Sequence, residues 1–212
     1  MSNPREYQTE AVIIRKTRLG EADLIITFFT PGMGKLQGFA KSVRKTRSKL
    51  SGHLELLTHS QVTLVRGKNL DAIIGSQTIN SFFPLRKCLE STSCGLYLAE
   101  LVNLFTAEAD RIDNQQLFQL LTDTLEYLSQ GIINQVLCLR YFEIQLLNLT
   151  GYRPQLKVCT VCRKSLQPVV NIFSPGAGGM LRTTCSDGKN LPYRISVNGL
   201  KVLRLLQDCS FQ

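Results

Sequence analysis

Three cysteines in the last third of the chain have a spacing that suits a metal ion. Cys159 and Cys162 form a Cys-x-x-Cys pair, and Cys185 follows in a later loop. Two such pairs would complete the four thiolates of a structural zinc site. Arg182 stands where the second pair would need its first cysteine, and a guanidinium stays protonated and cannot bind zinc.

Two interpretations of this segment stay open. In the first, the three thiols hold zinc, and Asp187 or water takes the fourth position. In the second, the segment has lost its metal and keeps its thiols in a small apolar core. The two histidines, His53 and His59, belong to another part of the chain. Structural zinc sites are normally closed, so the sequence leaves zinc as an open cofactor assignment.

A basic stretch in the first third of the chain suits phosphate binding. No acidic residue occurs between Asp23 and Glu55, whereas six cations do: Lys35, Lys41, Arg44, Lys45, Arg47 and Lys49. Concentrated positive charge attracts polyanions, and each neutralised phosphate releases counterions, so binding should be salt-sensitive. We interpret these residues, with Arg66 and Lys68 of a later turn, as candidate DNA-binding residues. A solvated basic loop, or one that docks an acidic protein, is the alternative.

Other residues that could do chemistry are predicted to pack in the core or at the barrel rim. Phe28, Phe29 and Phe39 can stack on bases, but adjacent residues of a strand face opposite sides, which favours packing. Four cysteines in helical patterns are predicted to be buried small hydrophobic groups: Cys88, Cys94, Cys138 and Cys209.

No catalytic motif is present. The sequence lacks a paired-carboxylate, Ser/His/Asp or Cys/His set, a P-loop and a dinucleotide fingerprint. Gly176, Gly178 and Gly179 look like a phosphate loop, but no Lys-Ser/Thr follows them. We therefore predict a protein that is not an enzyme; a nuclease, which needs clustered carboxylates for Mg²⁺, is a distant alternative.

Composition and charge fit a folded protein with a polyanionic partner. The net charge is +9, with 12 Lys/Arg against 6 Asp/Glu in residues 1–80, 4 against 8 in 81–150, and 9 against 2 in 151–212. Seven cysteines without an export signal indicate reduced thiols or metal ligands. No apolar run approaches the length of a membrane span. We expect a cytoplasmic protein.

The elements that position these residues follow from the periodicity. Five strand patterns, in residues 9–19, 22–29, 34–43, 53–65 and 71–79, predict a closed five-stranded barrel of the OB type. Lys41 to Lys49 would lie on a loop at the barrel rim. The helical period then appears in three packed helices, ending at 105, 129 and 149, and returns in residues 196–206.

These patterns predict an α+β protein with two domains. Residues 1–82 would form an OB-fold DNA-binding domain. Residues 83–212 would form a helical domain, in which residues 153–192 are a degenerate, zinc-ribbon-like insertion.

Several separated segments resemble the RecO family. The run GEADLIITFFTPGMGKLQGFAKSVRKTRSKLSGHLELLTHSQVTLVRGKNLDAIIGSQ is similar to the N-terminal region of that family. FEIQLLNLTGYRPQLKVCTVC and FSPGAGGML resemble its C-terminal helical region and zinc-binding segment. The resemblance extends from about Glu10 to Leu206.

The resemblance implies a bacterial recombination mediator of DNA repair. It implies binding of single- and double-stranded DNA, annealing of complementary strands, and work with a RecR-type partner and the single-strand binding protein to load the RecA recombinase near the nucleoid. The basic barrel loop of the family corresponds here to Lys41, Arg44, Lys45, Arg47 and Lys49. Cys159, Cys162 and Cys185 match three of four zinc ligands of members that have the site, and Arg182 departs from the pattern.

Two points stay open beside this interpretation. The main rival function is a basic interaction adaptor that binds acidic segments of partner proteins, with DNA incidental. The chain ends at Gln212, which is short for the family, so a natural short tail and a truncation are both compatible with the sequence.

Overall fold

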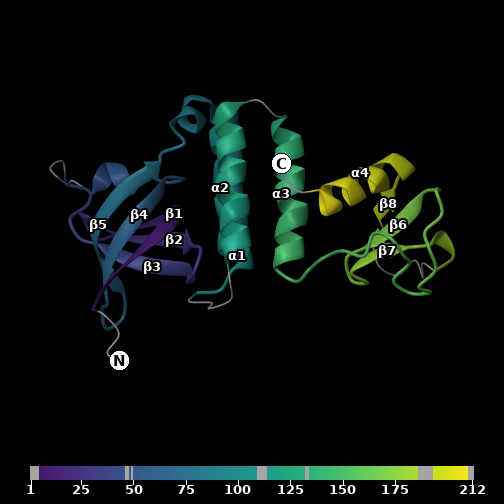
Figure 1. Ribbon diagram of the computed structural model, residues 1–212, viewed down its shortest axis with the longest axis horizontal. Coiled ribbons are helices and arrows are strands. Elements are labelled where there is room, and N and C mark those ends of the chain that lie inside the picture. The colour runs from purple at the N-terminus through teal and green to yellow at the C-terminus, as the bar shows by residue number, and fades with distance from the viewer. Residues whose placement is uncertain are drawn as a thin grey trace. The chain divides into compact units, whose positions relative to one another are not determined.

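The computed structural model describes residues 5–45, 48, 50–108, 114–131, 134–185 and 193–209. Its described residues pack as two compact units, Met1–Leu139 and Arg140–Gln212. Strands come first and helices follow, so the α+β class is confirmed (Figure 1). The domain boundary at residues 82 and 83 stays a prediction.

Five strands of the first unit form a closed barrel in the order β1-β2-β3-β5-β4, which confirms the OB-type prediction. The strands are β1 (Glu6–Leu19), β2 (Asp23–Thr30), β3 (Gly34–Ala40), β4 (His59–Val65) and β5 (Asp71–Asn80). The fourth strand begins later than predicted because Ser51–His53 forms a short 3₁₀ turn, η1. Closure pairs each strand with a neighbour on both sides over at least part of its length.

The barrel interior is apolar, as the alternation of each strand requires. Ile26, Phe28 and Leu64 are among its fully buried side chains. Phe29 is also fully buried, with its ring centroid 6.4 Å from that of Phe118. The prediction of core or rim packing is confirmed for Phe28 and Phe29, which lie in the core, and Phe39 is half-buried on the outer face of β3.

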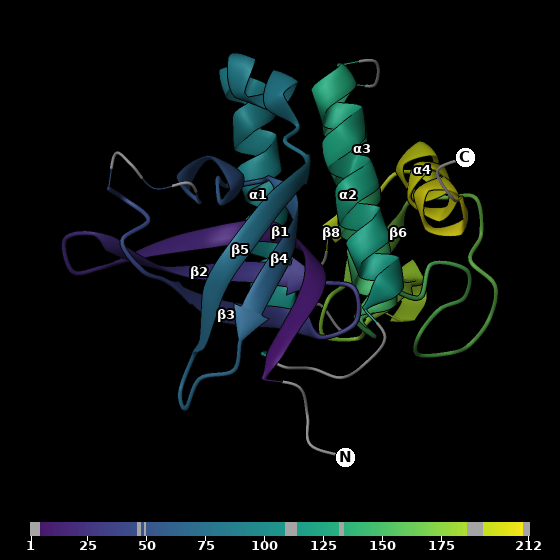
Figure 2. The same ribbon diagram turned by 60° about the vertical axis from the view of Figure 1, so that its left-hand side comes forward.

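The hairpin of β1 and β2 extends past the rest of the barrel. β4 pairs with β1 only from Glu6 to Val12, whereas β2 pairs with β1 as far as Leu19. The end of this hairpin therefore has no β4 partner (Figure 2). The connection between β3 and β4 crosses its inward face, where Val43 and Leu54 join the barrel core.

Helices follow the barrel in the first unit. A 3₁₀ turn, η2 (Phe83–Lys87), leads to α1 (Leu89–Phe105) and α2 (Gln115–Gln130), which pack against each other and against β1 and β2. Gly95 permits the close approach of α1, because a Cβ there would lie 2.7 Å from the Leu57 side chain. α2 ends at Gly131, whose left-handed conformation is a common helix stop.

α3 (Gln135–Leu149) begins in the first unit and continues in the second. The Asn134 side chain accepts a hydrogen bond from the Leu137 N–H at 3.2 Å and so caps the helix. Gln135 donates to the Ser91 hydroxyl of α1 at 2.7 Å. No helix in the described part of the chain is long and apolar enough to cross a membrane.

The second unit contains a three-stranded sheet and a final helix. Its elements after α3 are β6 (Asn171–Ser174), β7 (Gly179–Leu181), η3 (Thr183–Cys185), β8 (Tyr193–Ile195) and α4 (Val197–Asp208), and the sheet order is β7-β6-β8. The loss of helical character after residue 153 and its return near residue 196 are confirmed. A small cluster of Leu156, Met180 and Leu200 forms the core.

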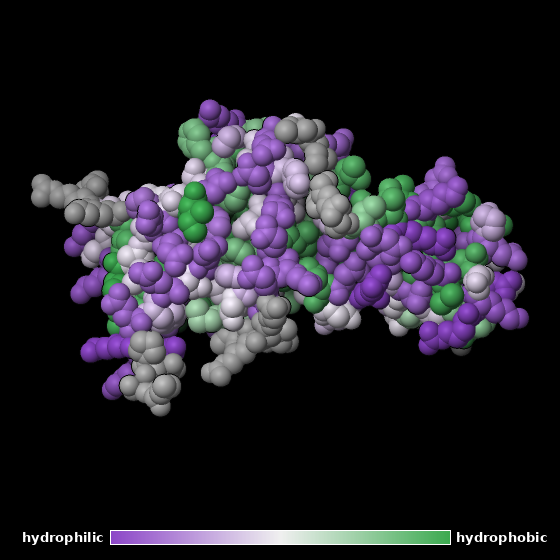
Figure 3. Space-filling model, viewed as in Figure 1, coloured by the Kyte–Doolittle hydropathy of each residue, from purple (hydrophilic) through white to green (hydrophobic). Residues whose placement is uncertain are grey.

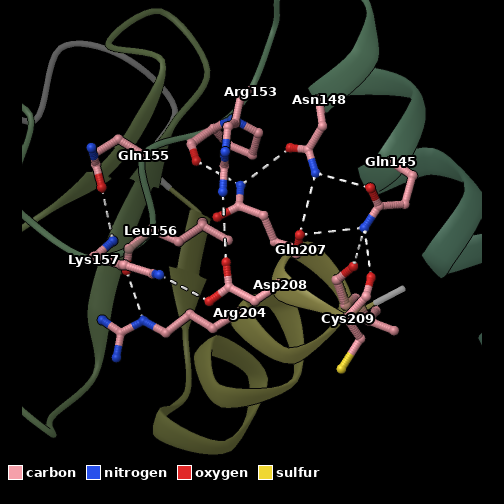
Figure 4. Close-up of polar contacts among 12 residues, drawn as sticks. Gln145, Asn148, Arg153, Gln155, Leu156, Lys157, Arg204, Gln207, Asp208 and Cys209 are labelled. Carbon is pink, nitrogen blue, oxygen red and sulfur yellow. Dashed lines mark hydrogen bonds and ion pairs between the residues drawn. The ribbon is translucent and has the colours of Figure 1, made fainter. Parts of the chain in front are cut away.

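Polar side chains connect the elements of this second unit (Figure 4). The Gln145 amide donates to the Leu206 carbonyl at 2.7 Å, near the end of α4. The buried Gln207 donates to the Pro154 carbonyl at 2.9 Å, and Arg204 donates to the Leu156 carbonyl at 2.9 Å. These bonds satisfy carbonyl groups that a helix end and an irregular segment leave without backbone partners.

The burial prediction for the remaining cysteines is wrong at two of four positions. Cys138 is buried and Cys94 is half-buried, but Cys88 and Cys209 are exposed. Cys88 immediately precedes α1 and Cys209 immediately follows α4. Both therefore lie outside the regular helix, where the packed face of the helix no longer determines the direction of the side chain.

Candidate nucleic-acid interface

Three of the predicted cations lie together where the chain leaves β3. Lys41, Arg44 and Lys45 directly follow the strand, and backbone bonds hold this turn to the end of the β1–β2 hairpin. The Ser42 N–H donates to the Asp23 carboxylate at 2.6 Å. The Arg44 N–H donates to the Ala22 carbonyl at 3.0 Å. The turn therefore presents its cations from a fixed backbone.

The side chains of this basic turn are exposed and mostly unengaged. Lys41 and Lys45 make no side-chain hydrogen bond or ion pair with the described residues, and the Arg44 guanidinium donates to the Glu21 carbonyl at 2.7 Å. Hydrophilic residues cover much of the barrel on the face in Figure 3. Arg47 and Lys49, two further candidates, lie outside the described residues. We call Lys41, Arg44 and Lys45 the rim cations.

Lys16 joins this region although the sequence reasoning missed it. Lys16 pairs across the ladder with Ile26, whose side chain lies in the barrel core, so Lys16 also faces inward beyond the closed part of the barrel. Its ammonium lies 3.0 Å from the Glu55 carboxylate. Alternation along β1 could have revealed this direction only if the pairing register had been known.

Arg66 and Lys68 do not belong to this turn; they lie in the hairpin loop between β4 and β5. β3 pairs with β5 in parallel through Gly38 and Asp71, so this hairpin extends alongside β3 and away from the rim cations. The Arg66 guanidinium lies 5.0 Å from the centre of the Tyr7 ring. The structure therefore separates this pair of cations from the rim cations.

Contacts in the hairpin hold Arg66 and its surroundings in place. The Tyr7 hydroxyl donates to the Asp71 carboxylate at 2.5 Å, and the Gly67 N–H donates to the same carboxylate at 3.0 Å. Burial, followed by the hydrogen bond and the charge of Asp71, raises the Tyr7 pKa well above its usual range. The neutral phenol therefore stays a hydrogen-bond donor at physiological pH.

Lys35 lies near the start of β3, and its ammonium is engaged within the protein. It donates to the Asn103 carbonyl at 2.7 Å, close to the end of α1. The Gln37 amide nearby donates to Glu108. Leu36, which lies between Lys35 and Gln37 in the sequence, faces the barrel core. Contacts with the helical part of the first unit thus cover this end of β3, so Lys35 is less available to a ligand than Lys41 and Lys45 are.

Cys159, Cys162 and Cys185 come together, with their sulfur atoms all within 4.8 Å of one another. The sulfur of the fully buried Cys159 accepts a hydrogen bond from the Arg182 N–H at 3.5 Å. Burial opposes ionisation of this thiol, but backbone N–H groups of Cys162, Arg182 and Val161 outweigh it and hold the Cys159 pKa below its usual range. The cluster could bind a metal ion.

The chain matches two family models and several curated proteins. Residues 1–82 match the model described as Recombination protein O N terminal, and residues 86–212 match Recombination protein O C terminal. A protein named DNA repair protein RecO from Dehalococcoides mccartyi (strain CBDB1) is 48% identical over 211 residues, which cover 100% of this chain and 82% of that protein.

More distant relatives carry the same name. The DNA repair protein RecO of Roseiflexus sp. (strain RS-1) is 39% identical over 204 residues, or 96% of this chain and 71% of that protein. That of Halalkalibacterium halodurans is 30% identical over 206 residues, or 97% of this chain and 79% of that protein. With both family models matched and these identities extending over nearly its whole length, the chain belongs to the RecO family of bacterial DNA repair proteins.

Proposed function

We propose that this protein is a non-enzymatic recombination mediator that binds single- and double-stranded DNA through the phosphates. The observation that carries the proposal is the group of rim cations on a fixed turn, in which the side chains of Lys41 and Lys45 are exposed and make no hydrogen bond or ion pair with the described residues. A cation that makes no internal ion pair gives its full charge to a ligand. Arg47 and Lys49 extend the same basic segment in the sequence.

Phosphate binding of this kind is independent of base sequence, because phosphate contacts position a strand without specifying it. When the protein holds a strand through its phosphates, the bases of that strand stay free to pair. The second unit is also rich in cations, with Arg163, Lys164 and Arg194 exposed. In this proposal the rim cations hold one strand and the basic second unit holds another, which promotes annealing of complementary strands.

The mediator role rests on the family. In the cytoplasm of a bacterium, at the nucleoid, the protein would act with a RecR-type partner and the single-strand binding protein, and would help a recombinase to load on coated strands. The relatives' name, DNA repair protein RecO, supports the repair context. Residues 1–82 are proposed as the OB-fold DNA-binding domain and residues 83–212 as the helical domain.

The cysteine cluster is proposed as a structural zinc site in which the three thiolates take three positions. Asp187, the fourth ligand considered beside water, lies outside the described residues. The three thiols are close enough to share an ion, and soft thiolates suit zinc. Among the described residues no fourth ligand joins them, and Arg182 cannot serve. Zinc would supply no reaction chemistry here. It would connect the turn at residues 159–162 to the segment that carries Cys185.

The experiment that tests DNA binding compares two double variants of equal charge. Lys41→Ala/Lys45→Ala removes two exposed rim cations, and Lys87→Ala/Arg140→Ala removes two cations from the acidic middle of the chain. Fluorescence anisotropy measures the affinity of each variant for a labelled mixed-sequence single strand, and a strand-annealing assay uses the same preparations. We expect the first variant to bind about tenfold more weakly at low salt and to anneal more slowly.

The control variant should bind as the unchanged protein does. Equal affinity in all three proteins would contradict the assignment of the rim cations. If the unchanged protein binds no strand at low salt but binds an acidic peptide, the interaction-adaptor function replaces the DNA-binding one.

A further inference from the structure

A pocket of ≈ 220 Å³ opens beside the rim cations. It lies where the β1–β2 hairpin extends past β4, on the face of the hairpin that continues the barrel interior. The connection between β3 and β4 closes its other side with Val43 and Ser51. The pocket is therefore a result of the uneven lengths of the strands, and described residues line it.

The pocket combines a polar mouth with an apolar floor. Lys16, Arg44 and Lys45 bring three cations, and Glu55 brings one carboxylate, which is paired with Lys16 at 3.0 Å. The lining thus carries a net positive charge, and the Lys45 ammonium makes no hydrogen bond or ion pair with the described residues.

The floor consists of side chains from the barrel core. Leu24, Val43 and Leu54 line the pocket, and each is at least nine-tenths buried. A bare phosphate ion makes no favourable contact with such an apolar floor, and the negative charge of the Glu55 carboxylate would repel it. A ligand that has both an anionic group and a flat, largely apolar group satisfies both parts of the pocket.

We propose that this pocket binds one unstacked nucleotide of single-stranded DNA. The phosphate would lie against Arg44 and Lys45, and the base would lie on Leu24, Val43 and Leu54. The Glu55 carboxylate can accept a hydrogen bond from an amino group on a base edge. This inference rests on the proposed DNA-binding function and assigns a specific place to one part of it.

The pocket discriminates between single and double strands. Bases in a duplex are paired and stacked, so none can enter without the free energy of unstacking being supplied. A single strand has unstacked bases, and contact of each base with a protein surface adds to affinity whatever the base. The phosphates of both forms can reach the rim cations, but a nucleotide of the single strand alone can fill the pocket.

The test fills the pocket without changing charge. Ser51→Leu places a larger apolar side chain in the pocket wall, and Ser93→Leu is the matched control, because Ser93 is an exposed serine of α1 that also donates to a nearby carbonyl. We expect Ser51→Leu to lower the affinity for a single strand about tenfold and to leave duplex affinity within a factor of about two. Ser93→Leu should change neither affinity.

Equal single-strand affinity for Ser51→Leu and the unchanged protein would overturn the pocket assignment while leaving DNA binding at the rim intact. A second readout follows the methyl NMR signals of Leu24, Val43 and Leu54 during titration of the unchanged protein with thymidine monophosphate or inorganic phosphate. We expect the nucleotide to shift these signals and phosphate alone to leave them in place. Equal shifts with both would make the pocket a simple anion site. Failure of the unchanged protein to bind any DNA would contradict the proposed function itself.

Discussion

The barrel unit and the second unit differ in how their elements are held together. In the barrel, a large closed core holds the fold, and the side chains of Lys41 and Lys45 are exposed with no hydrogen bond or ion pair among the described residues. In the second unit the clustered core is small, and Lys157 and Arg204 bind groups of their own unit. A large apolar core can stabilise a fold by itself, whereas a small core needs polar contacts to hold its elements together.

This difference predicts a division of effects. Removal of a cation from the barrel rim should weaken DNA binding and leave stability unchanged. Removal of a polar contact from the second unit should lower stability and leave rim binding unchanged. Each of the following changes tests one side of that division.

The largest loss of stability is expected from Cys159→Ser in the second unit. A serine there loses the buried sulfur that accepts the Arg182 N–H, and any metal bound by the three thiols loses a ligand. We expect ~2–4 kcal/mol less stability, measured by chemical denaturation. Addition of a chelator should lower the stability of the unchanged protein but not of this variant. Unchanged stability in Cys159→Ser would show that the cluster does not support the fold.

A smaller loss is expected from Gln207→Leu. Its buried amide donates to the Pro154 carbonyl at 2.9 Å, and a leucine of similar size leaves that carbonyl without its donor. We expect a cost of about 1–2 kcal/mol, because an unsatisfied buried polar group keeps its desolvation penalty. Thermal unfolding provides the measurement, with DNA affinity on the same preparation. A loss of DNA affinity at full stability would contradict the division between the units.

The sequence predicted the strands and helices well because their periodicity is local. It also placed the basic loop between the third and fourth strands. Lys16 was missed because its direction depends on pairing with Ile26, which no local pattern contains. The bond of Lys35 to the Asn103 carbonyl was also missed, because it connects residues far apart in the chain. The cysteines at the helix ends were misjudged because periodicity does not fix where a helix stops.

A modest pH effect is expected where the barrel meets α2. The His59 ring lies 5.4 Å from the Phe118 ring and 3.1 Å from the Glu10 carboxylate, and its burial lowers the His59 pKa from 6.5 despite that carboxylate. A histidine with a lowered folded pKa supports the fold above the unfolded pKa and destabilises it as the pH falls through the folded value. Stability should therefore decline as the pH falls below about 6.5. In His59→Gln, the free energy of unfolding should decline less between pH 7 and pH 5 than in the unchanged protein. An equally steep decline in the variant would mean that other groups cause the pH dependence.

The smallest effect is expected from Asp208→Asn. This exposed carboxylate lies 2.9 Å from the Lys157 ammonium and 3.6 Å from an Arg153 nitrogen, as Figure 4 shows. Exposed ion pairs contribute little, so we expect a loss of less than ~1 kcal/mol that high salt removes. Thermal unfolding at two salt concentrations measures it. A larger loss of stability that persists in high salt would mean that Asp208 stabilises the second unit by something other than these screened ion pairs.

The most direct test of the division between the units is a salt series of single-strand affinity, measured by fluorescence anisotropy for the unchanged protein, Lys41→Ala/Lys45→Ala and Gln207→Leu. Each lost phosphate contact reduces the slope of log affinity against log salt by about 0.7 for a single strand. The account predicts a slope that is shallower by up to about 1.4 for the double lysine variant and unchanged for Gln207→Leu. An unchanged slope in the double lysine variant would contradict it.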